Sequence, residues 1–347
     1  MRNTTDILSL TDEQLSESLI SLGFQKYRAK QVSDWLWKHA VRSFDLMTNL
    51  SKENRQLLSE KFFIPAITLD THQISMDGTV KFRFKLHDGK MIESVLIPVD
   101  EKDRYTVCVS SQAGCSLTCS FCATGKMGLL RQLTASEIFD QYVLVNQYCL
   151  ERYEKKLSNI VFMGMGEPLL NYKNVLHSIS RLTSDKGPNL SSRRITISTA
   201  GISKMIKKLA DDNKGINLAL SLHAANDEKR VEMMPINESN NLSSLMDALT
   251  YYSKNSSGKI SYEYIAFEHF NDTAADAKNL IRLCSRFHVT VNIIEYNPVK
   301  GVEYEKSSED RINSFAKQVR DHGIMITVRK SRGKDIDAAC GQLANKS

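Results

Sequence analysis

Three cysteines lie close together in the run Cys115-Ser-Leu-Thr-Cys119-Ser-Phe-Cys122, with three residues between the first two and two between the last two. Three thiolates at this spacing can bind three irons of a 4Fe-4S cluster and leave the fourth iron free for another ligand. Gly114 before the run and Phe121 within it allow a loop that wraps closely around a cluster and shields it from water. The spacing therefore predicts an iron-sulfur site that can do chemistry.

Disulfide bonding and zinc binding are the competing interpretations of this run. Disulfides need an oxidising compartment, but the chain begins with a polar segment unlike a secretion signal, and its seven cysteines are an odd number. A structural zinc site needs a fourth Cys or His nearby, and the next histidine along the chain is His177. We therefore expect reduced thiols in the cytoplasm.

This C-x3-C-x2-C loop resembles that of the radical SAM enzymes. In those enzymes the amino and carboxylate groups of S-adenosylmethionine (SAM) bind the open iron of the cluster. The resemblance implies an enzyme that generates carbon radicals, with a 4Fe-4S cluster on Cys115, Cys119 and Cys122 and SAM as cofactors.

Composition limits the class of protein. The chain has 347 residues, 41% of them apolar, which is enough for one large core and a small second unit. Because no run of about 18 apolar residues is present, we expect no membrane-spanning helix. The net charge of +6 is moderately basic and by itself identifies no partner.

Residues 1–64 are expected to form a helical accessory domain. Helices are predicted to start at Thr11, near Tyr27 and at Ser51, each from an N-cap or a helical spacing of apolar residues. The unit is rich in basic residues and carries four aromatic side chains that suit an RNA-binding element: Phe24, Tyr27, Trp35 and Trp37. The alternative is that these aromatics form the unit's own core and the charges face water.

In residues 65–98 the apolar side chains recur at every second position. Apolar residues from Val80 to Leu86 alternate with basic ones, and Asp77-Gly78 and Asp88-Gly89 are strong turn signals. We expect a short antiparallel β-hairpin extension with a basic polar face, which connects the helical domain to the rest of the chain.

Residues 99–347 alternate short β-branched runs with amphipathic helices, which is typical of a parallel β/α architecture. The expected strands are 105–109, 159–163, 194–198, 217–222, 261–266, 290–295 and 325–329, and the expected helices are 134–148, 171–183, 201–212, 243–254, 273–286 and 308–321. Six β/α units and a closing strand are fewer than a full barrel needs. The predicted fold class is α/β, a partial (β/α)6 radical SAM barrel.

Unusual residues follow these strands at their carboxyl ends, the face on which β/α barrels place their chemistry. Gly164 and Gly166 are expected to bring backbone close to a ligand, and Glu167 to accept a hydrogen bond from the amino group of SAM. Other candidates for binding the ribose, carboxylate or adenine of SAM lie at the ends of later strands: Ser198, Ser221, Leu222, His223 and Asn297. Singly, such residues are more often structural; together with a cluster loop on the same rim they predict a SAM site.

Two further cysteines bear on the reaction class. Cys108 lies at the end of the first predicted barrel strand, where a buried cysteine commonly packs as a small apolar residue. Cys340 has small neighbours and follows the basic stretch from Arg329 to Lys334, which we expect to favour a thiolate. Cys149 and Cys284 have apolar neighbours at helical positions and are expected in the core.

Six motifs, in order along the chain, resemble the RlmN/Cfr family of radical SAM adenine methyltransferases. They are Cys108-Val-Ser-Ser-Gln-Ala-Gly-Cys115, the run from Phe162 to Asn171, Arg194-Ile-Thr-Ile-Ser-Thr-Ala-Gly201, Leu220-Ser-Leu-His-Ala224, Met234-Pro-Ile-Asn237 and Asp337-Ala-Ala-Cys-Gly-Gln-Leu343. The likeness extends from about residue 20 to the end of the chain. Several linked motifs are far more specific than the cluster loop alone.

The resemblance implies a sequence of reactions with two SAM per turnover. One SAM methylates Cys340, and a second is cleaved at the cluster to a radical that activates the S-methyl group for addition to adenine. Cys108 then attacks the sulfur of Cys340, which releases the product and leaves a disulfide. The family also assigns a glutamate to remove the adenine proton, and this position matches Glu93, which by its strand position alone would face water.

The resemblance also implies the partners: 23S ribosomal RNA, transfer RNA and an electron donor such as flavodoxin or ferredoxin. Nothing in the sequence suggests more than a monomer. The product is expected to be methylated at carbon 2 of adenosine. The Cfr group, which methylates carbon 8, tends to have Gly-Glu-Ala where this chain has Gly166-Glu167-Pro168. An alternative from another class is an iron-sulfur protein that binds RNA and transfers no methyl group.

Overall fold

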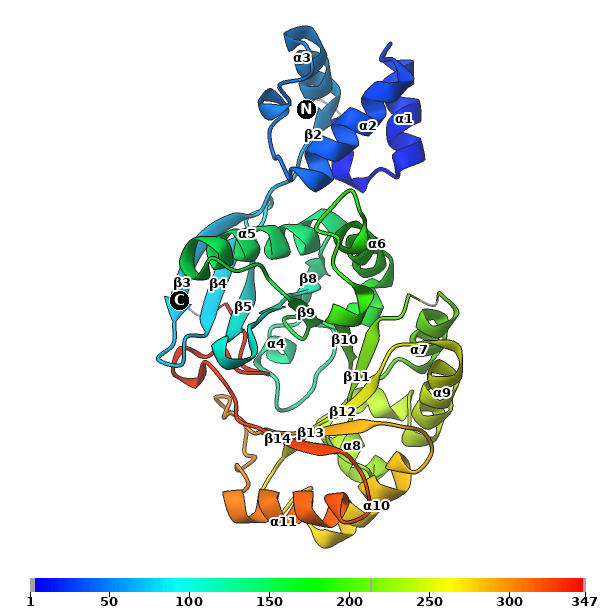
Figure 1. Cartoon of the computed structure of the whole chain (residues 1–347). Coiled ribbons are helices and arrows are strands. Elements are labelled where there is room, and N and C mark those ends of the chain that lie inside the picture. Colours follow the sequence, from blue (N-terminus) through cyan, green and yellow to red (C-terminus); the bar gives the residue numbers. More distant parts are fainter. Residues whose placement is uncertain (1–3, 213, 346–347) are drawn as a thin grey trace.

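The computed structural model describes residues 4–212 and 214–345. A helical unit stands at one end of a larger α/β body (Figure 1). Its helices are α1 (Asp12–Ser21), α2 (Lys26–Ser33), which continues into a π-helical turn at Asp34–Lys38, and α3 (Lys52–Lys61). Thr11 caps α1 by accepting a hydrogen bond from the Gln14 amide, as the sequence predicts.

Only part of the aromatic set in the helical unit faces solvent. Phe24 and Trp37 are buried, which corrects the view that they are exposed for RNA, whereas Tyr27 is half exposed. Amphipathic helices bury such side chains because apolar area removed from water stabilises the fold. Two of the four aromatic side chains are therefore part of the hydrophobic core rather than of an exposed surface.

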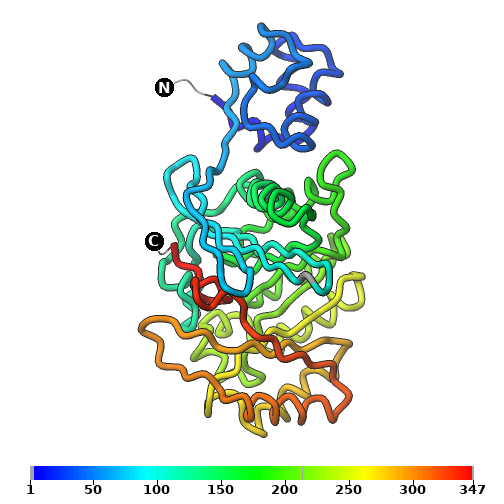
Figure 2. Tube along the Cα trace, turned by 60° about the vertical axis from the view of Figure 1, so that its left-hand side comes forward, coloured from blue at the N-terminus to red at the C-terminus, as the bar shows by residue number. Residues whose placement is uncertain are grey.

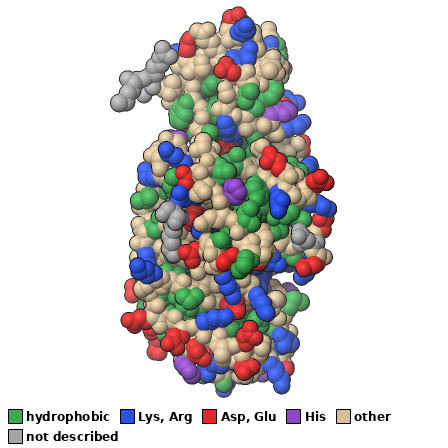
Figure 3. Space-filling view, turned by 90° about the vertical axis from the view of Figure 1, so that its left-hand side faces the viewer, with side chains coloured by type: hydrophobic (Ala, Val, Ile, Leu, Met, Phe, Trp, Pro, Cys, Tyr) green, Lys and Arg blue, Asp and Glu red, His purple; other side chains and the backbone are tan. Residues whose placement is uncertain are grey.

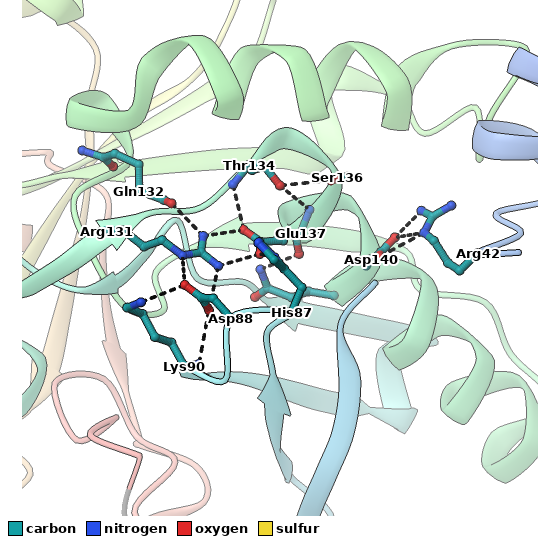
Figure 4. Close-up of polar contacts among 11 residues, drawn as sticks. Arg42, His87, Asp88, Lys90, Arg131, Gln132, Thr134, Ser136, Glu137 and Asp140 are labelled. Carbon is teal, nitrogen blue, oxygen red and sulfur yellow. Dashed lines mark hydrogen bonds and ion pairs between the residues drawn. The ribbon is translucent and has the colours of Figure 1, made fainter. Parts of the chain in front are cut away.

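The helical unit contacts the body through Trp37 and Arg42. The Trp37 ring packs edge-on against Phe139 of α5 (Ala135–Tyr153), and the Arg181 guanidinium of α6 (Tyr172–Thr183) lies over it at 4.7 Å. Arg42 forms a bidentate ion pair with Asp140 of α5, as Figure 4 shows. These contacts fix the unit against the outer helices of the barrel.

One ten-stranded sheet runs through the body, in the order β14-β13-β12-β11-β10-β9-β6-β5-β4-β3. The strands from β6 to β14 in this order are parallel. They are β6 (Arg104–Cys108), β9 (Asn159–Phe162), β10 (Ile195–Thr199), β11 (Asn217–Ser221), β12 (Ile260–Ala266), β13 (Thr290–Glu295) and β14 (Ile326–Arg329). The predicted partial barrel is confirmed.

The segment in which a β-hairpin is expected forms three antiparallel strands, and these strands are continuous with the barrel sheet. β3 (Thr68–Ile74), β4 (Val80–Lys85) and β5 (Met91–Val99) pair antiparallel, and β5 pairs antiparallel with β6. β3 is the sheet edge, and its pairing with β4 shifts at a bulge between Leu69 and Thr71. The face expected to be basic is only partly so, because Lys81 is buried.

The remaining helices and strands of the body cover the sheet or carry loops of its carboxyl rim. They are β7 (Gln112–Gly114), α4 (Ala123–Lys126), β8 (Leu129–Gln132), α7 (Ser203–Asp211), α8 (Asp227–Met233), α9 (Leu242–Asn255), α10 (Ala274–Cys284) and α11 (Glu309–Arg320). The short elements β7, α4, β8 and α8 were not predicted. Among the described residues, none of the helices has the length and apolar character needed to cross a bilayer.

The C-terminal segment returns to the antiparallel strands, beside which it lies in Figure 2. Asp335 accepts a hydrogen bond from Ser75 Oγ at 2.6 Å, and Asp77 accepts one from the Gly333 amide at 2.9 Å. Residues distant in sequence are thereby brought to the same side of the barrel, close to its carboxyl rim.

Candidate active site

A pocket opens at the carboxyl ends of the barrel strands. Its empty volume, with the open solvent at its mouth included, is about 920 Å³. Residues singled out from the sequence line the pocket: Cys115, Cys119, Phe121, Cys122, Gly164, Gly166, Glu167, Ser198, Ser221, His223 and Cys340. The structure therefore gathers the cluster loop, the strand-end polar residues and the C-terminal cysteine around one space.

The cysteine loop lies between β7 and α4. The Leu117 amide donates to Cys115 Sγ at 3.4 Å, and burial raises the pKa of Cys115 to about 11. Among the described residues, no three His, Cys, Asp or Glu side chains are arranged to hold a single metal ion. Because a 4Fe-4S cluster takes each thiolate on a different iron, its ligands stand farther apart than those of one zinc ion. The three thiols line one pocket, and a set of three cysteine ligands suits a 4Fe-4S cluster with one open iron.

Glu167 follows β9 and is buried at the base of the pocket. Its Oε2 accepts a hydrogen bond from the Ala200 amide at 2.7 Å, and its Oε1 accepts one from the Leu169 amide at 3.0 Å. Burial raises the pKa of Glu167 to about 7, against the lowering effect of these hydrogen bonds. A carboxylate this desolvated fits a cationic partner such as an ammonium group, which would favour its charged form.

Gly164 and Gly166 allow other atoms of the protein to pack closely against this turn. A Cβ on Gly164 would lie 2.7 Å from the Val109 carbonyl oxygen, and one on Gly166 would lie 2.4 Å from Cβ of Gln112. Gly166 also has a φ of +95°, which favours glycine. Close packing against the residues before the cluster loop therefore requires glycine at both positions, and both glycines also line the pocket.

Two serines and a histidine line another part of the pocket. Ser198 Oγ and Ser221 Oγ lie 3.5 Å apart, at the ends of neighbouring parallel strands. His223 Nδ1 accepts a hydrogen bond from the Ile265 amide at 3.1 Å, and burial, helped by Arg230, lowers the pKa of His223 to about 3. The imidazole is therefore neutral with its proton on Nε2, which leaves it one donor.

Two of the candidates for SAM binding, Leu222 and Asn297, do not line the pocket, and neither do Cys108 and Glu93. Leu222 is fully buried, and its amide donates to the Glu263 carbonyl oxygen at 3.0 Å. Asn297 is buried after β13, where its amide donates to Ser331 Oγ at 2.9 Å. In this conformation Asn297 holds the chain after β14 rather than facing the pocket.

Cys108 and Cys340 lie near each other although they are far apart in sequence. Cys108 is buried at the end of β6, and its pKa is raised strongly by burial and also by the nearby Cys340. Cys340 is exposed and lines the pocket, and desolvation by the surrounding protein raises its pKa to about 11, with a further contribution from Glu263. Arg329 of the basic stretch lowers this pKa, as expected, but its effect is smaller than that of desolvation, so the thiol form is favoured in this state. Cys149 and Cys284 are buried, as predicted.

Glu93 is buried, which corrects the expectation from its strand position that it faces water. Its Oε1 lies 3.6 Å from Lys81 Nζ, and its Oε2 accepts hydrogen bonds from the amides of Ala344 and Asn345 at 2.9 and 3.1 Å. The carboxylate therefore contacts the segment that follows Cys340.

Comparisons with known proteins agree with this geometry. The model of the ribosomal RNA large subunit methyltransferase N-terminal domain matches residues 5–64, and that of the radical SAM superfamily matches residues 109–284. A probable dual-specificity RNA methyltransferase RlmN of Cytophaga hutchinsonii is 52% identical over 340 residues, which are 98% of this chain and 93% of that protein. The dual-specificity RNA methyltransferase RlmN of Campylobacter fetus is 40% identical, over 100% of this chain and 99% of its own.

The chain belongs to the RlmN family. A crystal structure of a radical SAM methyltransferase from Sphaerobacter thermophilus superimposes with a TM-score of 0.92 at 39% identity, covering 99% of this chain and 100% of that one. The protein is thus a radical SAM RNA methyltransferase, and its superfamily implies a 4Fe-4S cluster and SAM.

In this RlmN family member, Arg230 of α8 is a site residue that the sequence did not reveal. Its side chain is fully buried, and burial lowers its pKa to about 10, so it remains charged at neutral pH. The guanidinium donates to the carbonyl oxygens of Ala200, Ser221 and Leu222 and, at 2.6 Å, to Asn237 Oδ1. It thereby joins the ends of β10 and β11 beneath the pocket. A lone arginine in a polar helix gives no sequence signal for such burial.

Proposed function

We propose that this protein methylates carbon 2 of adenosine in 23S ribosomal RNA and in transfer RNA, in the cytoplasm and as a monomer. The observation that carries the proposal is that the cysteine loop, Glu167 and Cys340 line one pocket. A methyl acceptor thiol beside a SAM site and a radical-generating cluster is the arrangement that such a reaction requires. The membership of the RlmN family supports the choice of RNA as substrate.

The cofactors are assigned to the residues of the pocket. Cys115, Cys119 and Cys122 would hold the cluster, and SAM, used twice per turnover, would supply both the methyl group and the radical. Gly166, Glu167, Ser198, Ser221 and His223 would bind SAM, and Leu222 and Asn297 are assigned to the same group by the family motif. Glu167 has an acceptor pair already ordered by two backbone amides, which suits the amino group of SAM.

Cys340 and Cys108 are proposed to carry the covalent steps. The sulfur of Cys340 takes a methyl group and loses its proton; the activated methyl carbon then bonds to the adenine. Cys108, as thiolate, attacks the sulfur of Cys340, so that an S–S bond forms and the bond from that sulfur to the substrate carbon breaks. The electron pair of the broken bond stays on that carbon, which takes up a proton to become the methyl group. The nearness of the two cysteines supports this order, and the high pKa of Cys108 requires that its proton be removed at that step.

Glu93 is proposed to remove the carbon 2 proton of the adenine adduct. Its support is its burial beside the segment that carries Cys340 and the free hydrogen-bonding capacity of Oε1. RNA phosphates would be bound by surface lysines and arginines, several of which lie together in the lower half of the face in Figure 3. Flavodoxin or ferredoxin would supply the electron.

The decisive test is anaerobic incubation of the reconstituted protein with SAM, a reductant and unmethylated 23S ribosomal RNA or transfer RNA, followed by nucleoside mass spectrometry. We expect 2-methyladenosine from wild type and none from Cys340→Ala, with Cys284→Ala as the matched control that keeps activity. The appearance of 8-methyladenosine instead would assign the Cfr reaction. Activity in Cys340→Ala would contradict the covalent mechanism.

A further inference from the structure

The three residues Ser110-Ser111-Gln112 run alongside the turn that carries Glu167. Ser110 Oγ accepts a hydrogen bond from the Met165 amide at 2.9 Å. The amides of Ser111 and Gln112 both donate to the Met165 carbonyl oxygen, at 2.9 and 3.1 Å. Because Gln112 is only three residues before Cys115, these bonds connect the cluster loop directly to the turn.

Gln112 makes the contact nearest to the pocket. Its Oε1 accepts a hydrogen bond from the backbone amide of Glu167 at 2.8 Å, and its side chain is fully buried. Gly166 packs so tightly against it that an added Cβ would lie within 2.7 Å of three Gln112 atoms. The Gln112 side chain is therefore the surface on which the Gly166-Glu167 backbone rests.

The Nε2 group of the Gln112 side chain also has a hydrogen-bond partner. Its Nε2 donates to Gln132 Oε1 at 3.0 Å, and Gln112 and Gln132 are paired residues of β7 and β8. Since Oε1 meets a donor and Nε2 meets an acceptor, the amide has one orientation that satisfies both partners.

A partly buried cluster of ion pairs connects β8 to neighbouring elements. Arg131 donates to Glu137 at 2.7 and 2.8 Å and to Asp88 at 2.7 Å, and it also donates to the Gln132 carbonyl oxygen (Figure 4). Glu137 is itself almost fully buried at the N-terminus of α5 and caps it through Thr134. β8, and with it Gln132, is thus fixed to the helix and to the turn between β4 and β5.

We propose that Gln112 is a positioning residue for SAM: it fixes the backbone of Glu167 relative to the cluster loop, so that the Glu167 carboxylate meets the amino group of the cofactor. Gln112 acts through Glu167 and is not expected to touch the reacting atoms. The inference rests on the proposed function only in placing SAM in the pocket. It predicts that the cluster can be intact while SAM binding is impaired.

The test measures SAM binding by anaerobic calorimetry on cluster-reconstituted, full-length protein. Gln112→Met keeps the length of the side chain and removes the acceptor for the Glu167 amide. We expect a Kd for SAM about ten-fold higher, which corresponds to about 1.4 kcal/mol, with unchanged iron and sulfide content. Adding SAM to the reduced cluster changes its electron paramagnetic resonance spectrum. In the variant, this change should need a correspondingly higher SAM concentration. Gln147→Met, on the exposed face of α5, is the matched control and should bind SAM as wild type does.

A second variant keeps the proposal falsifiable if Gln112→Met does not fold. Gln132→Met leaves Gln112 in place and removes only its far partner, and we expect a two- to three-fold higher Kd for SAM. The inference would be overturned if folded Gln112→Met had an unchanged Kd for SAM, or if its Kd rose only in proportion to a loss of iron. If only Gln132→Met folds, an unchanged Kd for SAM in that variant would overturn it. Absence of SAM binding in wild type would instead count against the proposed function.

Discussion

Lys81 Nζ lies 3.6 Å from Glu93 Oε1, and both side chains are buried between the antiparallel strands and the end of the chain. β4 and β5 place Lys81 opposite Val95 and Glu93 opposite Arg83, so the two residues are diagonal neighbours in the ladder. The same carboxylate accepts hydrogen bonds from Ala344 and Asn345. One ion pair thus joins the sheet to the segment that carries Cys340.

Replacing Glu93 by Ala should destabilise the protein because it leaves the Lys81 charge buried without a partner. We expect a loss of about 3–5 kcal/mol in the free energy of unfolding, measured with denaturant, and faster hydrogen exchange in residues 338–345. The double variant Lys81→Met with Glu93→Gln removes both charges and should recover most of the stability. Equal stability of Glu93→Ala and wild type would contradict the role of the pair.

Arg230→Met should weaken the rim of the pocket. The substitution leaves the carbonyl oxygens of Ala200 and Leu222 buried without their donor, so we expect a loss of several kcal/mol of stability and weaker SAM binding. Thermal unfolding and SAM titration measure the two effects. Arg282→Met, on the exposed side of α10, is the control and should change neither quantity.

His177 should make the contact between the helical unit and the barrel sensitive to pH. Burial, with the Arg181 guanidinium beside it, lowers the pKa of His177 below 6.5, so the fold favours the neutral ring. The unfolded state then binds more protons, and the contribution to stability is complete above about pH 6.5 and declines as pH falls toward the lowered pKa.

Tryptophan emission can follow this effect, because both tryptophans of the chain, Trp35 and Trp37, lie in the helical unit. His177→Gln should flatten the pH dependence of the unfolding midpoint between pH 6.5 and 5, whereas the exposed His322→Gln should leave it unchanged. A wild-type midpoint that does not vary in this range would refute the prediction.

Cys108→Ser should stop the reaction after the carbon bond to the RNA has formed, because a hydroxyl cannot resolve the adduct as a disulfide. We expect a covalent protein–RNA species on a denaturing gel, no free methylated RNA, and normal iron content. Cys340→Ser should give neither species. Release of methylated RNA by Cys108→Ser at the wild-type rate would exclude the proposed role of Cys108.

Periodic elements were predictable from the sequence because their signals are local. The strand at Thr290–Glu295 has the predicted bounds, and the predicted helix at residues 171–183 differs by one residue from α6, since β-branched runs and helical spacing are read within a short window. The convergence of the cluster loop and strand-end residues followed from the rule that parallel strands present their carboxyl ends on one face.

Contacts between distant segments were not predictable. Glu93 was expected to face water because single-sided strands alternate, but both faces of β5 are covered, one partly by the C-terminal segment. Arg230 and Gln112 owe their importance to the carbonyl and amide groups that the fold brings to them. Their residue types carry no signal of that environment.

The bulge in β3 between Leu69 and Thr71 affects the tendency of the protein to aggregate at high concentration. β3 is the outermost strand of the sheet, all seven of its residues are exposed, and Asp70 is drawn to Arg83 at 2.6 Å. An edge strand interrupted by a bulge offers another chain no regular row of amides and carbonyls to pair with. The irregularity therefore protects a ten-stranded sheet from growing edge to edge into aggregates.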